Sequence, residues 1–552
     1  MIRSPFLKKA LAALLLSSGL TAPLSFAQTT NSEYWVYELQ PGEHVWKVAH
    51  ELLTDWRKWQ EIVELNDIRN DRLMAAGTTI RIPKAFIEER DSTIEVLDAA
   101  GPVTLKGQSG EAQIKSHESN LAVNVGDVIT TGDNGSVLIR FEDNTELMLT
   151  PNSTLHIERA SVVGSQRKVF DVNVTLQNGE AEIKANPNKR KGTHFVIETP
   201  AAFATTRGTV YRVRADGNIT QAEVTQGKID VANTQGTTRV PQRFGTVTEK
   251  DKAPSKPKQL LKAPLIEPLK TVRYLPARLE WPTQKGAAAY RAQISDKADF
   301  SRLVYDYTGP VPKLNIPVEF SDGQYWLRIR GIDQDGLQGL ETLEAFSIDA
   351  RPFPPVVQAP LPNKPSYTGD LTFQWTQPQD VTSFVFELSK DVSFEQSVIT
   401  LETDQTQLIQ PIDEAGQYYW RVTSISTEGK KGPVGFTNEL EVKPTPQTPE
   451  LAEPEATEES LNFAWQKDPT SSQYQVQLAL DAQFEKMVED VYATEAFTSV
   501  PRPEMGTYYF RVRGIDADQY PGGWSAIQKL EVPLESYKPL MIWTVFTAIL
   551  FL

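Results

Sequence analysis

The sequence predicts a mainly β protein built from several small domains, with one short βααβ module near its start. Its 552 residues suggest roughly three to five domains at about 150 residues each. Strand patterns of period two fill most of the chain, and in its second half they recur with a period of roughly ninety residues. Apolar residues at helical spacing are concentrated in one short region, 33–85.

The composition excludes several classes of protein. There are 56 Lys and Arg against 71 Asp and Glu, a net charge of −15, which argues against a nucleic-acid partner. The chain has no Cys and therefore no disulfides, thiolate metal site, cysteine nucleophile or lipidated N-terminal cysteine. Collagen and wholly disordered chains are excluded by the 40% hydrophobic content. We expect no cofactor and no metal.

Residues 1–27 have the pattern of a secretory signal peptide. Positive charges precede an apolar run at 10–16, and Ser25-Phe26-Ala27 supplies the small-x-small pattern that signal peptidase accepts. An N-terminal membrane helix is the alternative, but the run is short and polar residues interrupt it. We expect an exported protein of the periplasm or cell envelope of a bacterium.

The first module, 33–85, has the order strand, helix, helix, strand. Tyr34-Trp35-Val36-Tyr37 alternates as a strand, two helical patterns follow, and Thr79-Ile80-Arg81-Ile82-Pro83 closes the module. This order resembles a LysM module. The matching positions are Gly42, Val45, Val48, Ala49, Asn66, Leu73, Gly77, Ile80, Ile82 and Pro83. Glu43 and His44 depart from the pattern, which usually has Asp and then Thr or Ser.

The LysM resemblance implies binding of N-acetylglucosamine polymers such as peptidoglycan. The groove would lie between the turn before the first helix and the loop after the second. Its residues here would be Gly42, Glu43, His44, Val45, Ile68, Arg69, Asn70, Asp71, Arg72 and Leu73. His44 could fill the groove, stack on a sugar, or stand in water at the helix start. Packing of Trp46, Trp56 and Trp59 as a hydrophobic cluster is favoured over sugar stacking.

The region 92–248 predicts a second, all-β domain. Asn178-Gly179 and Gln226-Gly227 each separate two alternating runs, which predicts hairpins at both places. Glu142-Asp143 could be a catalytic carboxylate pair, but turn chemistry is the favoured interpretation.

Several motifs of this region, in order and spacing, resemble a FecR domain. They include Val125-Gly126-Asp127, Pro151-Asn152-Ser153, Gln177-Asn178-Gly179-Glu180, Thr199-Pro200, Arg207-Gly208-Thr209 and Gln226-Gly227. Signalling members of that family pair the domain with a membrane helix and a cytoplasmic arm that regulates a sigma factor. The segment before the apolar run is too short for such an arm. The resemblance therefore implies a periplasmic domain that passes or receives a signal carried by a protein partner.

A polar, proline-bearing linker at 249–273 leads to three similar blocks, 274–350, 367–443 and 455–533. Each block has an early strand ending in Trp281, Trp375 or Trp465 and a late Gly-x-Tyr strand. This pattern resembles the fibronectin type III module and implies three immunoglobulin-like β-sandwiches. The tryptophans are expected in the cores rather than as sugar platforms.

The C-terminal tail, 537–552, has no charge after Lys538. As a helix, residues 539–552 would reach only about 20 Å, too short for an ordinary membrane span. The tail could be the stub of a membrane anchor, an interfacial segment, or a piece that packs on the last sandwich.

No HExxH, Gly-x-Ser-x-Gly or phosphate-binding loop is present, so we expect no enzyme. The favoured function is a non-catalytic envelope scaffold that binds peptidoglycan through the LysM module and presents the later domains to a protein partner. One alternative is a periplasmic sensor or regulatory partner of a membrane signalling protein. A second is an envelope glycan hydrolase whose carboxylate site is assembled from distant strands.

Overall fold

The computed structural model describes residues 33–39, 42–108, 110–115, 120–164, 168–188, 193–206, 208–362 and 364–533. The predicted signal peptide (1–27) and C-terminal tail (537–552) lie outside these residues. Within the described ranges, no helix is both long and apolar enough to cross a membrane. The chain divides into two compact units: 1–269 with 278–314 and 324–346, and 270–277 with 315–323 and 347–552.

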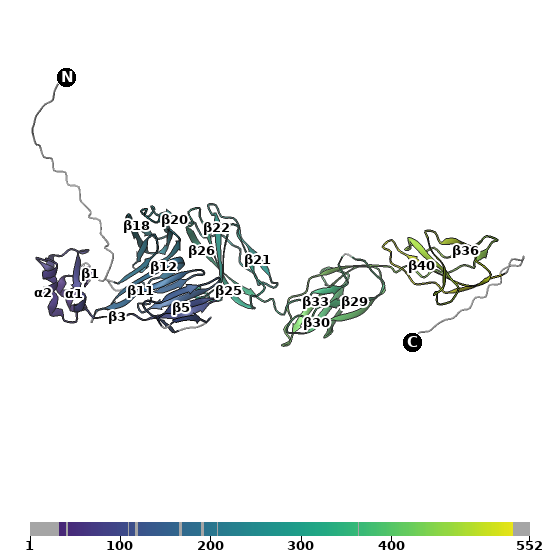
Figure 1. The fold of residues 1–552 in the computed structure, drawn as a ribbon, viewed down its shortest axis with the longest axis horizontal. Coiled ribbons are helices and arrows are strands. Elements are labelled where there is room, and N and C mark those ends of the chain that lie inside the picture. The colour runs from purple at the N-terminus through teal and green to yellow at the C-terminus, as the bar shows by residue number, and fades with distance from the viewer. Residues whose placement is uncertain are drawn as a thin grey trace, which may run out of the picture. The chain divides into compact units, whose positions relative to one another are not determined.

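The N-terminal module has the predicted βααβ order (Figure 1). β1 (Tyr34–Glu38) pairs with β2 (Thr79–Pro83), and α1 (Val45–Leu52) and α2 (Trp59–Leu65) lie between them, with short 3₁₀ turns at Trp56–Lys58, Asp71–Leu73 and Lys84–Phe86. The Asn66 side-chain amide donates to the carbonyls of Ile62 and Arg81, both at 2.8 Å, and its Oδ1 accepts from Arg81 N. Asn66 thereby joins the end of α2 to β2.

The central β domain comprises β3 to β20 and contains two sheets that share the long strand β12 (Val169–Lys184). The first sheet has the order β6-β5-β8-β11-β12-β13-β14-β17-β18, with β3 beside β11. The second has the order β7-β4-β9-β10-β12-β15-β16-β19-β20.

The strands of this domain are bounded as follows: β3 (Glu89–Asp91), β4 (Ile94–Ala100), β5 (Val103–Gly107), β6 (Gly110–Ile114), β7 (Leu121–Val123), β8 (Val128–Thr131), β9 (Ser136–Phe141), β10 (Glu146–Leu149), β11 (Thr154–Val163), β13 (His194–Glu198), β14 (Phe203–Thr206), β15 (Val210–Asp216), β16 (Ile219–Gln226), β17 (Lys228–Asn233), β18 (Gly236–Pro241), β19 (Phe244–Glu249) and β20 (Lys258–Gln259). β20 lies inside the predicted linker 249–273 and pairs with β19.

The two predicted hairpins of this domain were wrong. β12 runs straight through Asn178-Gly179, and β16 and β17, on either side of Gly227, do not pair with each other. Gly179 (φ +86°) and Gly227 (φ +82°) do have the left-handed backbone that the turn chemistry predicted. At both positions, however, the chain crosses from one sheet to the other instead of folding back on itself.

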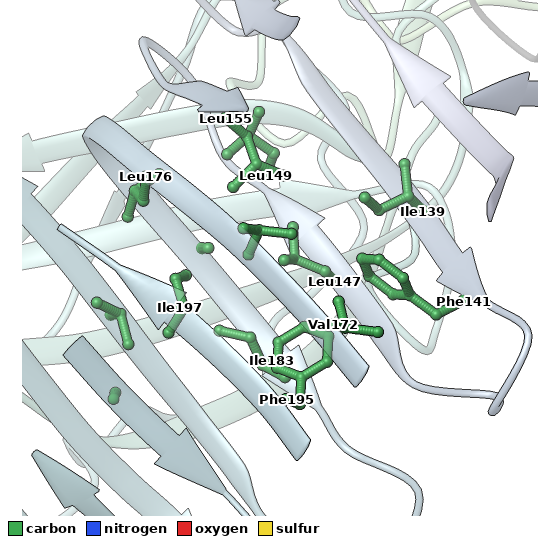
Figure 2. Packing of buried hydrophobic residues seen from close by; sticks show 14 of the residues in the cluster. Ile139, Phe141, Leu147, Leu149, Leu155, Val172, Leu176, Ile183, Phe195 and Ile197 are labelled. Carbon is green, nitrogen blue, oxygen red and sulfur yellow. The ribbon is translucent and has the colours of Figure 1, made fainter. Parts of the chain in front are cut away.

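The core of the β domain is a continuous cluster of aliphatic and aromatic side chains between the two sheets (Figure 2). Phe141 meets Phe195 edge-on, with 5.2 Å between ring centroids. Val163 and Val169, at the tip of the β11–β12 hairpin, instead join the core of the N-terminal module. Because this apolar contact is shared, the module and the β domain are packed together rather than joined only by a linker.

Three fibronectin-like repeats follow. The first contains β21 (Ala277–Glu280) paired with β24 (Lys313–Ile316), and the sheet β23-β22-β25-β26. The second contains the sheets β27-β29-β32 and β28-β34-β33-β30-β31, and the third contains β35-β36-β39 and β38-β37-β40-β41. Trp281, Trp375 and Trp465 are buried, as the core interpretation predicted.

The strands of the repeats are bounded as follows: β22 (Ala289–Ser295), β23 (Leu303–Gly309), β25 (Gly323–Ile332), β26 (Gln338–Ile348), β27 (Val357–Ala359), β28 (Ser366–Tyr367), β29 (Gly369–Trp375), β30 (Val381–Ser389), β31 (Ser397–Thr403), β32 (Gln407–Ile412), β33 (Gly416–Ser426), β34 (Asn438–Lys443), β35 (Glu455–Ala456), β36 (Ser460–Ala464), β37 (Gln473–Ala479), β38 (Met487–Ala493), β39 (Phe497–Pro501), β40 (Gly506–Ile515) and β41 (Gln528–Val532).

Candidate functional site

The structure brings together the two segments that were predicted to form the glycan groove. His44 begins α1, where its Nδ1 accepts from Lys47 N at 3.3 Å. The same Nδ1 lies 3.8 Å from Oδ2 of Asp71, which belongs to the loop that follows α2. Gly42 has φ +79°, and a Cβ placed there would meet nothing within 4 Å, so the turn is open on that side.

The remaining predicted groove residues divide into buried and exposed positions. Val45 belongs to the module core, and Glu43 is only 8% exposed, with its Oε2 accepting from Tyr37 OH at 2.8 Å. Their side chains face inward, so only their backbone can line a groove. Ile68 packs partly against the same core. Arg69, Asn70, Arg72 and Leu73 are exposed, and Asn70 Oδ1 accepts from Arg72 N.

The three tryptophans of the module have different environments. Trp59 packs partly against the core, as the hydrophobic-cluster interpretation predicted. Trp46 and Trp56 are 42% and 39% exposed and meet edge-on at 6.4 Å, with His50 beside both rings. They form an aromatic patch on the surface and are not part of the core.

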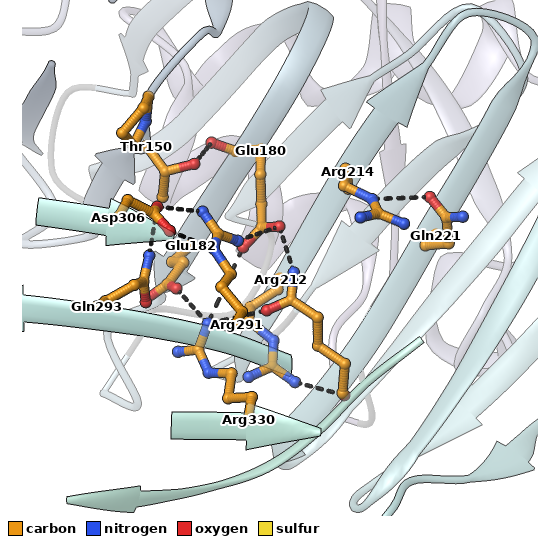
Figure 3. Close-up of polar contacts among 12 residues, drawn as sticks. Thr150, Glu180, Glu182, Arg212, Arg214, Gln221, Arg291, Gln293, Asp306 and Arg330 are labelled. Atoms are coloured by element: carbon orange, nitrogen blue, oxygen red, sulfur yellow. Dashed lines mark hydrogen bonds and ion pairs between the residues drawn. The ribbon is translucent and has the colours of Figure 1, made fainter. Parts of the chain in front are cut away.

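A second polar site, which the sequence did not reveal, lies between the β domain and the first repeat (Figure 3). Glu180 and Glu182 project from β12, and Arg291 of β22 and Arg330 of β25 project toward them. Arg328, also of β25, contacts Glu182. We call this group of five residues the interdomain ion network. Its arginines are at most 10% exposed, and the side chains of Glu180 and Glu182 are 3% and 17% exposed.

The carboxylates of β12 are shared among the arginines. Glu180 Oε2 lies 2.6 Å from Arg291 Nη1. Glu182 Oε1 accepts from Arg330 Nη1 at 2.7 Å and from Arg328 Nη2 at 3.0 Å. This shared geometry satisfies the charges that burial would otherwise leave uncompensated.

Residues of the first repeat hold these arginines in position. Asp306 accepts both Nε and Nη2 of Arg291, at 3.0 and 2.6 Å, and Glu341 Oε2 accepts Nε and Nη2 of Arg330. Gln293 Oε1 accepts from Arg328. The repeat therefore presents preformed guanidinium groups to the β domain.

Direct backbone contacts complete this interface. Arg212 of β15 donates from Nη2 to the carbonyls of Gln338 and Gly339, at 2.8 and 3.0 Å. Glu223 Oε1 accepts from Gln338 N at 3.0 Å, and Ser136 Oγ donates to Leu303 O at 3.1 Å.

Burial and the arginines of this interface shift the pKa values of Glu182, Glu341 and Glu223 in different directions. Burial by itself would raise the pKa of Glu182, but Arg328 and Arg330 outweigh it and hold this pKa well below its usual range. Burial also opposes ionisation of Glu341, and the same two arginines again lower its pKa. Glu223 is different, because burial dominates over Arg212 and raises its pKa.

A polar cavity of about 560 Å³ opens beside this network, lined by residues of both domains that include Asn134, Asn152, Arg214, Arg291 and Asp306. Three of its charged groups are already paired, since Arg291 contacts both Glu180 and Asp306. No group of three or more His, Asp or Glu side chains in the described part of the chain is arranged to hold a metal ion.

The structure supports turn chemistry for Glu142 and Asp143. Glu142 pairs with Arg90 and accepts from Thr93 N at 3.2 Å, and the Arg90 guanidinium lowers the pKa of Glu142. Asp143 accepts from the backbone and hydroxyl of Thr145 at 2.8 and 2.9 Å.

Sequence reasoning missed the interdomain ion network because alternating charged residues on a strand normally indicate a solvent-facing side. A signal was present in Glu180-Ala181-Glu182 and in Arg328-Ile329-Arg330, where like charges two residues apart share one face of a strand. Opposite charges of this kind on two strands are complementary, but the sequence does not reveal that the strands meet.

Comparison with known proteins identifies part of the β domain. Residues 127–230 match the family model described as FecR protein, so the chain contains a FecR domain over these residues, inside the predicted region 92–248. No curated protein matches the chain.

Three groups of solved structures are similar to parts of the chain. A putative anti-sigma factor from Parabacteroides distasonis ATCC 8503 is 16% identical over 24% of this chain and 59% of its own, with a TM-score of 0.20. The FN1–FN3 domains of chicken CNTN1 are 13% identical over 48% of this chain and 99% of their own (TM-score 0.24). Fibronectin(III)-like modules of Clostridium thermocellum CbhA are 14% identical over 34% and 100% (TM-score 0.22).

Proposed function

We propose that the protein is a non-catalytic component of the bacterial cell envelope that acts in signalling or regulation, with its FecR domain contacting a membrane protein partner. The match of residues 127–230 to the FecR family carries this proposal. The pattern of a secretory signal peptide at 1–27 supports an envelope location.

The packing of the β domain supports this role. On one side Val163 and Val169 enter the core of the N-terminal module, and on the other Glu180 and Glu182 pair with arginines of the first repeat. A partner that binds the β domain therefore contacts a body whose neighbouring domains are held in place. The repeats serve as a scaffold for that body.

Site-specific photo-crosslinking of the full chain in the bacterium that produces it tests this proposal. A photoreactive residue is placed at Lys228 or Gln242, which are exposed on the β domain, and as a control at Asp404 or Gln405, which are exposed on the second repeat. We expect cross-links to one membrane protein from the β domain positions only. Cross-links from neither β domain position, or equally from the control positions, contradict the proposal.

We further propose that the N-terminal module binds peptidoglycan through the groove predicted from its LysM resemblance. The approach of His44 to Asp71, 3.8 Å apart, supports this second function because it joins the turn and the loop that would hold the glycan. The open side of Gly42 leaves room for a sugar ring there.

Co-sedimentation of the mature protein with purified sacculi tests glycan binding. Leu73→Glu places a charge on the groove loop, and Val36→Glu is its control on β1; the two native residues are 80% and 56% exposed. We expect the wild type and Val36→Glu to pellet with sacculi and Leu73→Glu to remain in solution. If the wild type does not pellet, the module has no glycan function. Release of soluble muropeptides would instead indicate a hydrolase.

A further inference from the structure

The third repeat carries a copy of the polar face with which the first repeat contacts the β domain. The third-repeat face consists of Gln475, Gln477, Asp490, Arg511 and Arg513. The corresponding residues of the first repeat are Arg291, Gln293, Asp306, Arg328 and Arg330. The strand registers establish this equivalence, since Gln477 lies opposite Asp490 and Arg511 just as Gln293 lies opposite Asp306 and Arg328.

The hydrogen bonds around the shared glutamine are also equivalent. Gln477 Oε1 accepts Nε and Nη2 of Arg511, at 2.9 and 2.7 Å, and Gln477 Nε2 donates to Asp490 at 2.9 Å. In the first repeat, Gln293 makes the same contacts with Arg328 and Asp306. Each arginine also stacks on a phenylalanine ring. Arg511 Cζ lies 3.9 Å from the ring centroid of Phe484, and Arg328 Cζ lies 4.6 Å from that of Phe300.

The two faces differ in what neutralises their arginines. In the first repeat, Glu341 pairs with Arg330, and Glu182 of the β domain pairs with both Arg328 and Arg330. In the part of the third repeat that the structure describes, no carboxylate lies within ion-pair distance of Arg511 or Arg513. Gln477 and Gln475 accept from Arg511 and Arg513 instead, and the Trp524 ring lies 4.2 Å from Arg511 and 4.4 Å from Arg513.

Trp524 fixes the arginines without removing their charge. A ring that contacts two guanidinium groups restricts their rotamers through cation–π attraction. Arg511 and Arg513 remain half-buried and Asp490 is exposed. A cavity of about 370 Å³, lined by residues that include Arg513 and the exposed Tyr492, adjoins the face. The face is therefore ordered, accessible and positive.

The second repeat lacks such a face. Val385, Thr400 and Thr423 occupy three of the five equivalent positions. The one arginine at these positions, Arg421, is neutralised by Glu387, which accepts two hydrogen bonds from it at 2.8 and 2.9 Å. The repeat fold by itself thus does not require exposed arginines at these positions.

We propose that the third-repeat face binds a partner protein that presents, on a β-strand, a carboxylate shared by Arg511 and Arg513. Charge complementarity and the internal precedent carry the assignment, because Glu182 of β12 pairs with both Arg328 and Arg330, the equivalents of Arg511 and Arg513, whereas Gln475 stands where Arg291 pairs with Glu180. A second copy of the chain is disfavoured as the occupant, since its own Glu180 and Glu182 are already covered by its first repeat.

Binding of a cyclic β-hairpin peptide to the full mature chain tests this proposal. The peptide carries Glu-x-Glu on one strand, and its control carries Gln-x-Gln. The protein variants are the double substitution Arg511→Gln with Arg513→Gln, and Arg421→Gln in the second repeat as the matched control. Fluorescence anisotropy of a labelled peptide at low ionic strength gives the affinity.

We expect the wild type and Arg421→Gln to bind the Glu-x-Glu peptide equally and the double variant to bind it at least about tenfold more weakly, in line with the strength of charge-assisted hydrogen bonds. The Gln-x-Gln peptide should not bind. Arg511→Lys with Arg513→Lys, which keeps the charges, should retain part of the affinity. Absence of wild-type binding, or equal binding by the double variant, overturns the proposal. A wild-type dimer that the double variant abolishes in sedimentation velocity also overturns it, because the occupant is then a second copy.

Discussion

Replacing Glu182 by Gln should loosen the first repeat from the β domain. The substitution keeps the size of the side chain but removes the negative charge that Arg328 and Arg330 share. Those guanidinium groups are 7% and 2% exposed, so water cannot replace the lost carboxylate without opening the interface.

The size of the effect follows from this burial. Removing one partner of a buried ion pair costs about 3–5 kcal/mol. Glu182 itself is 17% exposed, and Arg330 keeps Glu341, so we expect the lower end, about 3 kcal/mol. At about 1.4 kcal/mol for each factor of ten, local opening should become about a hundredfold more frequent.

Native-state hydrogen exchange measured by mass spectrometry resolves this effect within the full chain, where a single unfolding midpoint would mix several domains. Peptides covering β25 should lose about two powers of ten in protection. The control is Glu387→Gln in the second repeat, where the carboxylate is also 17% exposed but has a single partner, Arg421, which is 22% exposed. We expect about 1 kcal/mol for the control. Equal effects of the two substitutions would refute the proposed importance of the shared buried carboxylate.

Three further predictions concern the packing. Gly179→Ala should destabilise the β domain by at least about 2 kcal/mol, because φ at this position is +86° and the new Cβ would lie 2.5 Å from Ser153 Cα. Unchanged hydrogen exchange of β12 would contradict this. Trp375→Ala should cost the second repeat about 3–5 kcal/mol, measured as lost protection of β29 and β33, whereas unaltered protection would place Trp375 outside the core. Acid should loosen the interface of the first repeat. Folding lowers the pKa of Glu182 and of Glu341. The stability that these carboxylates contribute is therefore present above about pH 4.5, their unfolded pKa, and is lost as the pH falls through the folded pKa. Rising protection of β25 on acidification would contradict this.

The elements that repeat or that end in a characteristic residue could be predicted from the sequence. Trp281, Trp375 and Trp465 marked the same buried position in three repeats, and Asn66 marked the end of α2, where its amide hydrogen bonds to β2. In these cases the residue type and its local position are enough to determine whether the side chain is buried or ends a helix. The order of the module likewise brings His44 near Asp71, while glycan binding between these segments stays a prediction.

The path of the chain at Gly179 and Gly227 could not be predicted in the same way. The sequence indicated positive φ correctly, but a left-handed residue only turns the chain locally. Whether the next strand pairs with the previous one or joins another sheet depends on contacts with β15 and β14, which are not adjacent in the sequence to the strands they pair with.

The interdomain ion network shows why charged strand faces are hard to interpret from sequence alone. Arg328 and Arg511 occupy the same position, each hydrogen-bonded to a glutamine and stacked on a phenylalanine. The first is covered by Glu182 and the second is not, so the same local pattern supports either a closed domain interface or an open surface. A different residue separates the two cases: Glu341 of β26 contributes a carboxylate to the closed face, whereas Trp524, between β40 and β41, orders the open face and leaves its charge available. A repeat that had only to fold would resemble the second, with Arg421 closed by Glu387. Retaining two ordered and unneutralised arginines in the third repeat is therefore better explained by a binding function than by stability.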